Sequence, residues 1–180
     1  QTLNKFTGYK PKAVLTYCPS CHAHMDYSLK ETGISFDVPY LHVTEFITEN
    51  LHKLTFKNRI ERQVFLHSHS DNDQARMDTK FARAILEAIP GLDVLGDPGT
   101  SEWGHDCGGR QIGIIGQDVH DRLATEMFTA AKAVGADAIA ALYHSCYRQF
   151  CAQERDQKIE VLHYTALVAE ALDLPSREET

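Results

Sequence analysis

The sequence contains no long hydrophobic run. Its longest apolar stretches, such as residues 138–143, are far shorter than the ~20 residues that a membrane-spanning helix requires, so we expect a chain that does not span a membrane. Basic residues are also scarce: 18 Lys and Arg stand against 25 Asp and Glu, which gives a formal net charge of −7. Because nucleic-acid-binding domains use Lys and Arg to neutralise phosphates, this balance argues against a nucleic-acid partner.

Several catalytic and targeting signatures are missing. There is no GxSxG, Walker-type or GxGxxG sequence, so a hydrolase, a nucleotide triphosphatase or a dinucleotide-binding enzyme has no support. The glycine-bearing stretch at 108–116 has the wrong spacing for these motifs. Residues 1–15 carry no apolar signal region, and we therefore expect a cytoplasmic protein, either alone or in a complex at the membrane surface.

Glycine and proline are few, at 11 and 6 residues, which excludes collagen-like and disordered classes. A folded chain of 180 residues buries roughly 70% of the surface of its unfolded form, so its core needs no disulfide bond. The unusual residues are five cysteines and ten histidines. An odd number of cysteines without a secretory signal favours metal or redox chemistry over a disulfide framework, while isolated cysteines also serve as packing residues.

Short apolar runs alternate with amphipathic segments along the chain. Strands are expected at 13–17, 38–43, 63–67, 92–95, 138–143 and 159–162. Helices are expected from Pro19 to Gly33, after a Thr44 cap, over 73–89 and 117–134, after a Ser145 cap, and over 165–172. This alternation predicts an α/β fold with a short, mostly parallel sheet flanked by helices. No internal repeat is visible in the residues.

The first candidate site is the CxxC sequence of Cys18 and Cys21, which follows a predicted strand and opens a predicted helix. Two thiols placed in this way lie close together, and the helix dipole favours their thiolate forms. Thiolates bind soft metals or attack disulfides. The alternative is that both cysteines only pack.

Three further clusters carry cysteine or histidine, at 67–71, 105–109 and 144–151. The carboxyl ends of parallel strands are where ligands bind in such sheets, so the segments at 18, 67 and 144 are expected to converge on one edge. Residues five apart on a helix point about 140° away from each other, so Cys146 and Cys151 cannot both face one metal if both are helical.

The spacing of these clusters resembles that of the cysteine-rich CCG domain family. Its members include a subunit of heterodisulfide reductase and iron–sulfur subunits of glycolate, lactate and anaerobic glycerol-phosphate oxidising enzymes, and they usually carry two copies of Cys, then CCG, then CxxC. TYCPSCHAHM at 16–25 looks like the end of a first copy. HSHSD at 67–71, DCGG at 106–109 and HSCYRQFC at 144–151 look like a second copy.

The resemblance implies two units, residues 1–55 as the tail of a first CCG-like unit and residues 56–180 as a second one, with the opening half of the first lying upstream of Gln1. It also implies an iron–sulfur cluster, either 4Fe–4S or non-cubane, in contact with Cys18, Cys21, Cys107, Gly108, Cys146 and Cys151. The auxiliary metal ligands or proton donors would be His67, His69, His105 and His144.

Three positions depart from the family pattern: Ser70, Asp106 and Gln149 stand where cysteines are expected. The cluster ligands would then be Cys18, Cys21, Cys107 and either Cys146 or Cys151, unless a second chain or a missing segment supplies some of them.

The leading hypothesis is an oxidoreductase subunit of the heterodisulfide reductase type. It would receive electrons from a ferredoxin-like or flavin-containing partner subunit and pass them to a small disulfide, a quinone or a similar acceptor. A zinc site built from cysteine and histidine is a second hypothesis. The third hypothesis is a degenerate CCG domain that serves as a non-catalytic scaffold. Such a domain would be expected to lose cysteines, as at the three departures from the family pattern.

Overall fold

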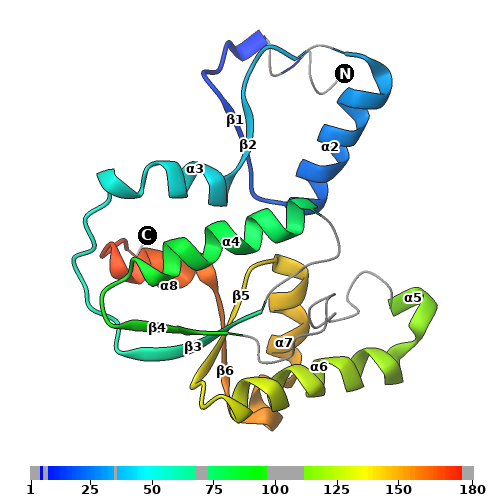
Figure 1. The fold of residues 1–180 in the computed structure, drawn as a ribbon. Coiled ribbons are helices and arrows are strands. Elements are labelled where there is room, and N and C mark those ends of the chain that lie inside the picture. Colours follow the sequence, from blue (N-terminus) through cyan, green and yellow to red (C-terminus); the bar gives the residue numbers. More distant parts are fainter. Residues whose placement is uncertain (1–4, 6–7, 35, 68–72, 97–111, 176–180) are drawn as a thin grey trace.

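The computed structural model describes residues 5, 8–34, 36–67, 73–96 and 112–175. Strands and helices alternate along it, as Figure 1 shows. The elements are β1 (Val14–Thr16), α2 (Pro19–Thr32), β2 (Tyr40–His42), α3 (Val43–Glu49), the 3-10 helix η1 (Leu51–Lys53), β3 (Arg62–His67), α4 (Asp73–Glu87), β4 (Leu92–Leu95), α5 (Ile112–Ile115), α6 (Gln117–Ala133), β5 (Ala138–Ala141), α7 (His144–Gln157), β6 (Glu160–His163) and α8 (Tyr164–Ala171).

The main sheet has four strands in the order β4-β3-β5-β6, and all neighbours run parallel. Successive strand residues point to opposite faces, so β3 sends Val64 and Leu66 to one face and Phe65 to the other. Helices α4 and α8 cover the first face, whereas α6 and α7 cover the second. The predicted α/β fold with a parallel sheet flanked by helices is thus confirmed.

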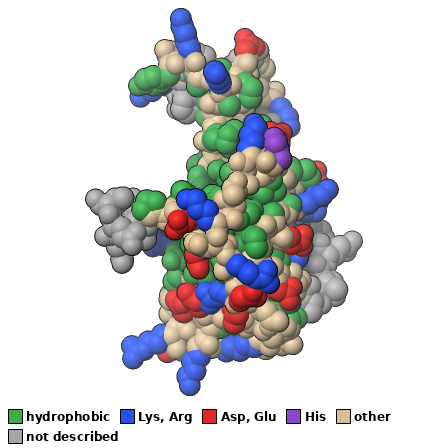
Figure 2. Space-filling view, turned by 90° about the vertical axis from the view of Figure 1, so that its left-hand side faces the viewer, with side chains coloured by type: hydrophobic (Ala, Val, Ile, Leu, Met, Phe, Trp, Pro, Cys, Tyr) green, Lys and Arg blue, Asp and Glu red, His purple; other side chains and the backbone are tan. Residues whose placement is uncertain are grey.

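A separate two-stranded parallel sheet, β1-β2, lies with α2 and α3 at one end of the molecule (Figure 1). Among the described residues from 8 to 54, all of the buried side chains are polar: they belong to His22, His42 and Thr44. Leu15 remains 43% exposed, and Figure 2 shows hydrophobic side chains on the surface of this end of the molecule. The N-terminal segment, residues 1–54, therefore has no apolar core of its own within its described part.

The N-terminal segment is anchored on the larger sheet through α3, which packs against α4. Ile47 and Leu51 are partly buried against the core between the sheet, α4 and α8. A hydrogen bond from the Thr48 hydroxyl to the carbonyl oxygen of Phe81 adds a polar contact, at 3.3 Å.

Two parts of the chain repeat the same local structure. The order β1-α2-β2-α3 recurs as β5-α7-β6-α8, and Thr16 pairs with His42 in the register in which Ala141 pairs with His163. In both, a His-x-Thr sequence joins the second strand to the following helix, at His42 and at His163. The repeat is hidden in the sequence because few other residues match.

Two helix starts differ from the expected ones. His42, not Thr44, caps α3, because its extended backbone places the ring where it accepts a hydrogen bond from the N–H of Thr44. Helix α7 begins at His144, so its N-cap is Tyr143 and Ser145 lies inside the first turn. The short helix α5 was not expected, and the strand expected at 138–143 ends at Ala141.

The turn at Gly91 gives a first test of the fold. Gly91 has φ +86°, and a Cβ there would lie 2.9 Å from Arg59 Cγ and 3.0 Å from the carbonyl oxygen of Ile60. We expect Gly91→Ala to lower the free energy of unfolding by at least about 2 kcal/mol. Gly33→Ala is the matched control, since Gly33 also has positive φ but faces open space, and about 1 kcal/mol is expected there. Equal losses in urea unfolding would contradict the close approach at Gly91.

Candidate functional site

The carboxyl edge of the main sheet is a row of three aligned residues. His67 at the end of β3 pairs with Ala141 on β5, and Ala141 pairs with His163 on β6. Helix α7, which carries Cys146, starts directly beyond this edge. Polar and sulfur-bearing residues thus gather where parallel α/β sheets bind their ligands.

Cys18 and Cys21 lie together at the start of α2. Cys18 is the N-cap, and its sulfur accepts a hydrogen bond from the backbone N–H of Cys21 at 3.2 Å. Both cysteines are exposed. The pKa of Cys21 is raised by its hydrogen bond with Cys18, by burial and by the repulsion between two thiolates. These effects on the pKa of Cys21 oppose the effect expected from the helix dipole.

Cys146 occupies in α7 the helix position that Cys21 occupies in α2, three residues after the N-cap. The N-cap itself is Tyr143, where α2 has Cys18. Cys146 is only 1% exposed and packs in the apolar cluster between the sheet, α6 and α7. The repeat therefore aligns Cys146 with the second cysteine of the CxxC, not with the first.

Cys151 is partly buried later in the same helix. Its thiol shares a hydrogen bond with the Tyr147 side chain, and burial raises its pKa. Since both Cys146 and Cys151 are helical, they point about 140° apart, as expected. They therefore do not form a chelating pair.

The two described histidines that the sequence singled out differ in environment. His67 is fully buried, and its ring meets the ring of Phe150 edge-on with centroids 5.0 Å apart. His144 is exposed at the first position of α7. The other predicted site residues lie outside the described ranges: His69, His105, Cys107 and Gly108, together with the substituted positions Ser70 and Asp106.

Within residues 8–34, 36–67, 73–96 and 112–175, no three His, Cys, Asp or Glu side chains lie close enough to hold a metal ion. The donor chemistry of Cys18 and Cys21 fits a soft metal or an iron–sulfur cluster, but it supplies only two ligands.

A polar network that was not expected from the sequence joins the N-terminal segment to the main sheet. The hydroxyl of Tyr17, the residue before Cys18, lies 2.9 Å from the ring nitrogens of His163. The backbone carbonyl of Tyr17 accepts a hydrogen bond from Nε2 of His42 at 3.3 Å. Burial lowers the pKa of both histidines, and that of His163 falls to about 4. Burial therefore favours the neutral form of both rings at pH 7.

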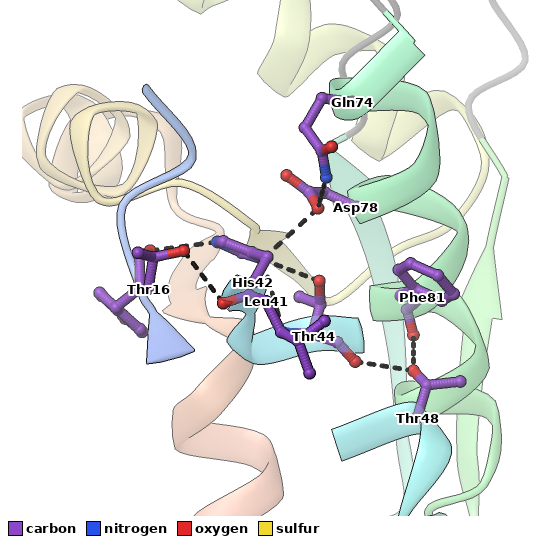
Figure 3. A network of polar contacts seen from close by, with 9 residues as sticks. Thr16, Leu41, His42, Thr44, Thr48, Gln74, Asp78 and Phe81 are labelled. Carbon is purple, nitrogen blue, oxygen red and sulfur yellow. Dashed lines mark hydrogen bonds and ion pairs between the residues drawn. The ribbon is translucent and has the colours of Figure 1, made fainter. Parts of the chain in front are cut away.

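Figure 3 shows the His42 ring between Thr44 and Asp78. The Asp78 side chain extends toward this ring from α4. Asp78 is fully buried, and one of its oxygens lies 3.5 Å from Nδ1 of His42 and accepts a hydrogen bond from Gln74 at 2.9 Å. Asp78 favours the charged form of His42, but burial of the ring has the larger, opposite effect on its pKa. The only sequence signal for the network is the pair of His-x-Thr motifs at the ends of two strands.

The fold and the site define an α/β protein with a parallel sheet and thiols at helix starts beyond its strands. Residues 72–151 match the family model of the CCG cysteine-rich domain, so the resemblance expected from the cysteine spacing is found over this segment. The matched segment includes Cys107, Cys146 and Cys151. No curated protein matches the chain. In the described ranges, no helix combines the length and the apolar character needed to cross a membrane.

Proposed function

We propose that this protein is an iron–sulfur redox subunit that resembles the CCG-containing subunit of heterodisulfide reductase. The observation that carries the proposal is the family match over residues 72–151, a cysteine-rich domain of the kind typical of iron–sulfur redox proteins. The exposed thiol pair of Cys18 and Cys21 supports it, since Tyr17 connects this pair to the carboxyl edge of the main sheet through His163.

The proposed cluster ligands are Cys18, Cys21, Cys107 and Cys146. Cys146 is preferred to Cys151 because it repeats the helix position of Cys21. When bound, the cluster would supply one-electron chemistry, and the protein would contribute thiolates and a partly dry site. His67, His69, His105 and His144 are proposed as auxiliary residues around these thiols.

The repeated β-α-β-α order supports a division of the chain into two units. We propose residues 1–55 as the tail of a first CCG-like unit and residues 56–180 as a second unit. The shared register, with Thr16 on His42 and Ala141 on His163, is what equivalent halves of two such units would show.

The proposed reaction partners follow from the family. A ferredoxin-like or flavin-containing subunit would deliver electrons, and a small disulfide or a similar acceptor would receive them. The location would be the cytoplasm, either free or in a complex at the membrane surface.

The test is the metal and sulfide content of protein purified without oxygen. We expect a brown protein with iron and acid-labile sulfide, and Cys21→Ser or Cys107→Ser should remove most of both. Cys151→Ser is the matched control and should keep them, because Cys151 points away from Cys146. Colourless protein with stoichiometric zinc would replace the redox proposal with a zinc site. Absence of any metal would leave the hypothesis of a non-catalytic scaffold.

A further inference from the structure

His42 and His163 make the same set of hydrogen bonds at two separate places. In each, Nδ1 lies 3.4 Å from the backbone nitrogen of the threonine two residues later and 2.8 Å from its hydroxyl oxygen. Each ring also has a hydrogen bond with the backbone of the residue before the N-cap of a cysteine-bearing helix. That residue is Tyr17 for His42 and Leu142 for His163.

The threonine N–H favours one tautomer of each ring, while at His42 the Asp78 oxygen 3.5 Å from Nδ1 acts against it. Because Nδ1 accepts the threonine N–H, its lone pair is free of a proton, and the proton of the neutral ring sits on Nε2. Nε2 can then donate to the carbonyl at the start of the cysteine helix. Each histidine thus connects the end of its own strand to the residue before the N-cap of the helix that follows the neighbouring strand.

Tyr17 belongs to both contacts. Its carbonyl oxygen is the acceptor for His42, and its hydroxyl lies 2.9 Å from the ring of His163. Since Tyr17 directly precedes Cys18, one residue links the first turn of α2 to the strand end beside α7.

We propose that His42 and His163 are positioning residues that fix the two cysteine-bearing helix starts, and that Tyr17 sets the place of Cys18 and Cys21 relative to Cys146. The role given to these residues rests on the proposed function, because an iron–sulfur cluster needs its thiols at fixed separations. The hydrogen bonds that define it exist without any cluster. Hydrogen-bond partners of this kind orient the ligands of metal sites and tune the reduction potential of the metal.

The first experiment is independent of a cluster. Long-range ¹H–¹⁵N NMR spectra of metal-free protein at pH 7 report the tautomer of each histidine. We expect both His42 and His163 to be neutral with the proton on Nε2. A proton on Nδ1, or a charged ring, would overturn the inference even if the protein holds no iron.

The second experiment removes single atoms of the network. Tyr17→Phe deletes only the hydroxyl, and we expect it to shift the backbone amide signals of both Cys21 and Cys146 in the metal-free protein. Tyr27→Phe, at an exposed tyrosine of α2, is the matched control and should leave the signal of Cys146 unchanged. Shifts confined to residues next to Tyr17 would show that it does not link the two helix starts.

The third experiment separates capping from positioning. His163→Asn keeps an acceptor near the place of Nδ1 and loses the donor at Nε2, whereas His163→Gln keeps the donor and loses the acceptor. In protein loaded with iron and sulfide, we expect His163→Asn to change the reduction potential and the EPR spectrum. We expect both properties of His163→Gln to lie closer to those of the unaltered protein. Identical potentials in all three proteins would contradict a positioning role, while failure of the unaltered protein to bind iron would refute the proposed function alone.

Discussion

Acidification from pH 7 to pH 4 is expected to lower the free energy of unfolding by about 3 kcal/mol through His163 alone. Burial and the nearby charge of His144 lower the pKa of His163 from 6.5 to about 4 in the folded protein. Below pH 6.5 the unfolded chain therefore takes up a proton that the folded chain does not, and stability falls until the pH reaches about 4. The pKa of His42 is lowered in the same direction and adds to the effect.

Urea unfolding at a series of pH values checks this expectation. Carboxylates also titrate in this range, so the informative quantity is the difference between the unaltered protein and His163→Asn. The variant should lose less stability on acidification, by about 3 kcal/mol, because its residue 163 does not titrate. His52→Asn, at an exposed histidine of η1, should follow the unaltered protein. If stability falls equally with pH in His163→Asn and in the unaltered protein, His163 takes up its proton in the folded state as readily as in the unfolded state.

Phe150→Ala is expected to lower the free energy of unfolding by about 3–5 kcal/mol. The Phe150 ring is fully buried and lies edge-on to Phe128 and His67, with centroids 5.9 and 5.0 Å apart. Removing the ring leaves a cavity between the sheet, α6 and α7. Because Phe150 lies one turn after Cys146 on α7, the cavity would also loosen the packing around that cysteine.

The matched control for Phe150→Ala is Phe46→Ala on α3. Phe46 is 39% exposed, and no more than about 1 kcal/mol is expected from its removal. Chemical denaturation at pH 7 compares the two variants. Similar losses would show that Phe150 is not part of a rigidly packed core.

Much of the fold could be predicted from the sequence because apolar periodicity follows burial. Residues 92–95 form β4 as expected, and the helix expected at 117–134 is α6, which ends one residue earlier. The helix starts were less predictable, since a cap depends on side-chain geometry as well as on residue type. Thr44 and Ser145 are good caps by residue type, but His42 and Tyr143 hold the N-cap positions.

The candidate site was predictable where the signal was local. The CxxC at the start of α2 is such a signal, because strand, thiols and helix follow one another in the chain. The network around Tyr17 was not predictable, since Tyr17 and His163 lie 146 residues apart and meet only when the N-terminal segment packs on the sheet. The alignment of Cys146 with Cys21 likewise required the two helix starts to be seen together.

The small sheet of the N-terminal segment differs from the main sheet in its expected resistance to local unfolding. Within the described residues β1 pairs only with β2, whereas its counterpart β5 has a strand on each side. Its attachment depends on the packing of α2 and α3 against α4, on the contact between His42 and Asp78 and on the hydrogen bonds of Tyr17, with no apolar core inside the described part of the segment itself. We therefore expect partial unfolding of residues 8–54 to be a smaller step than unfolding of the main sheet, with Cys18 and Cys21 in the less stable cooperative unit.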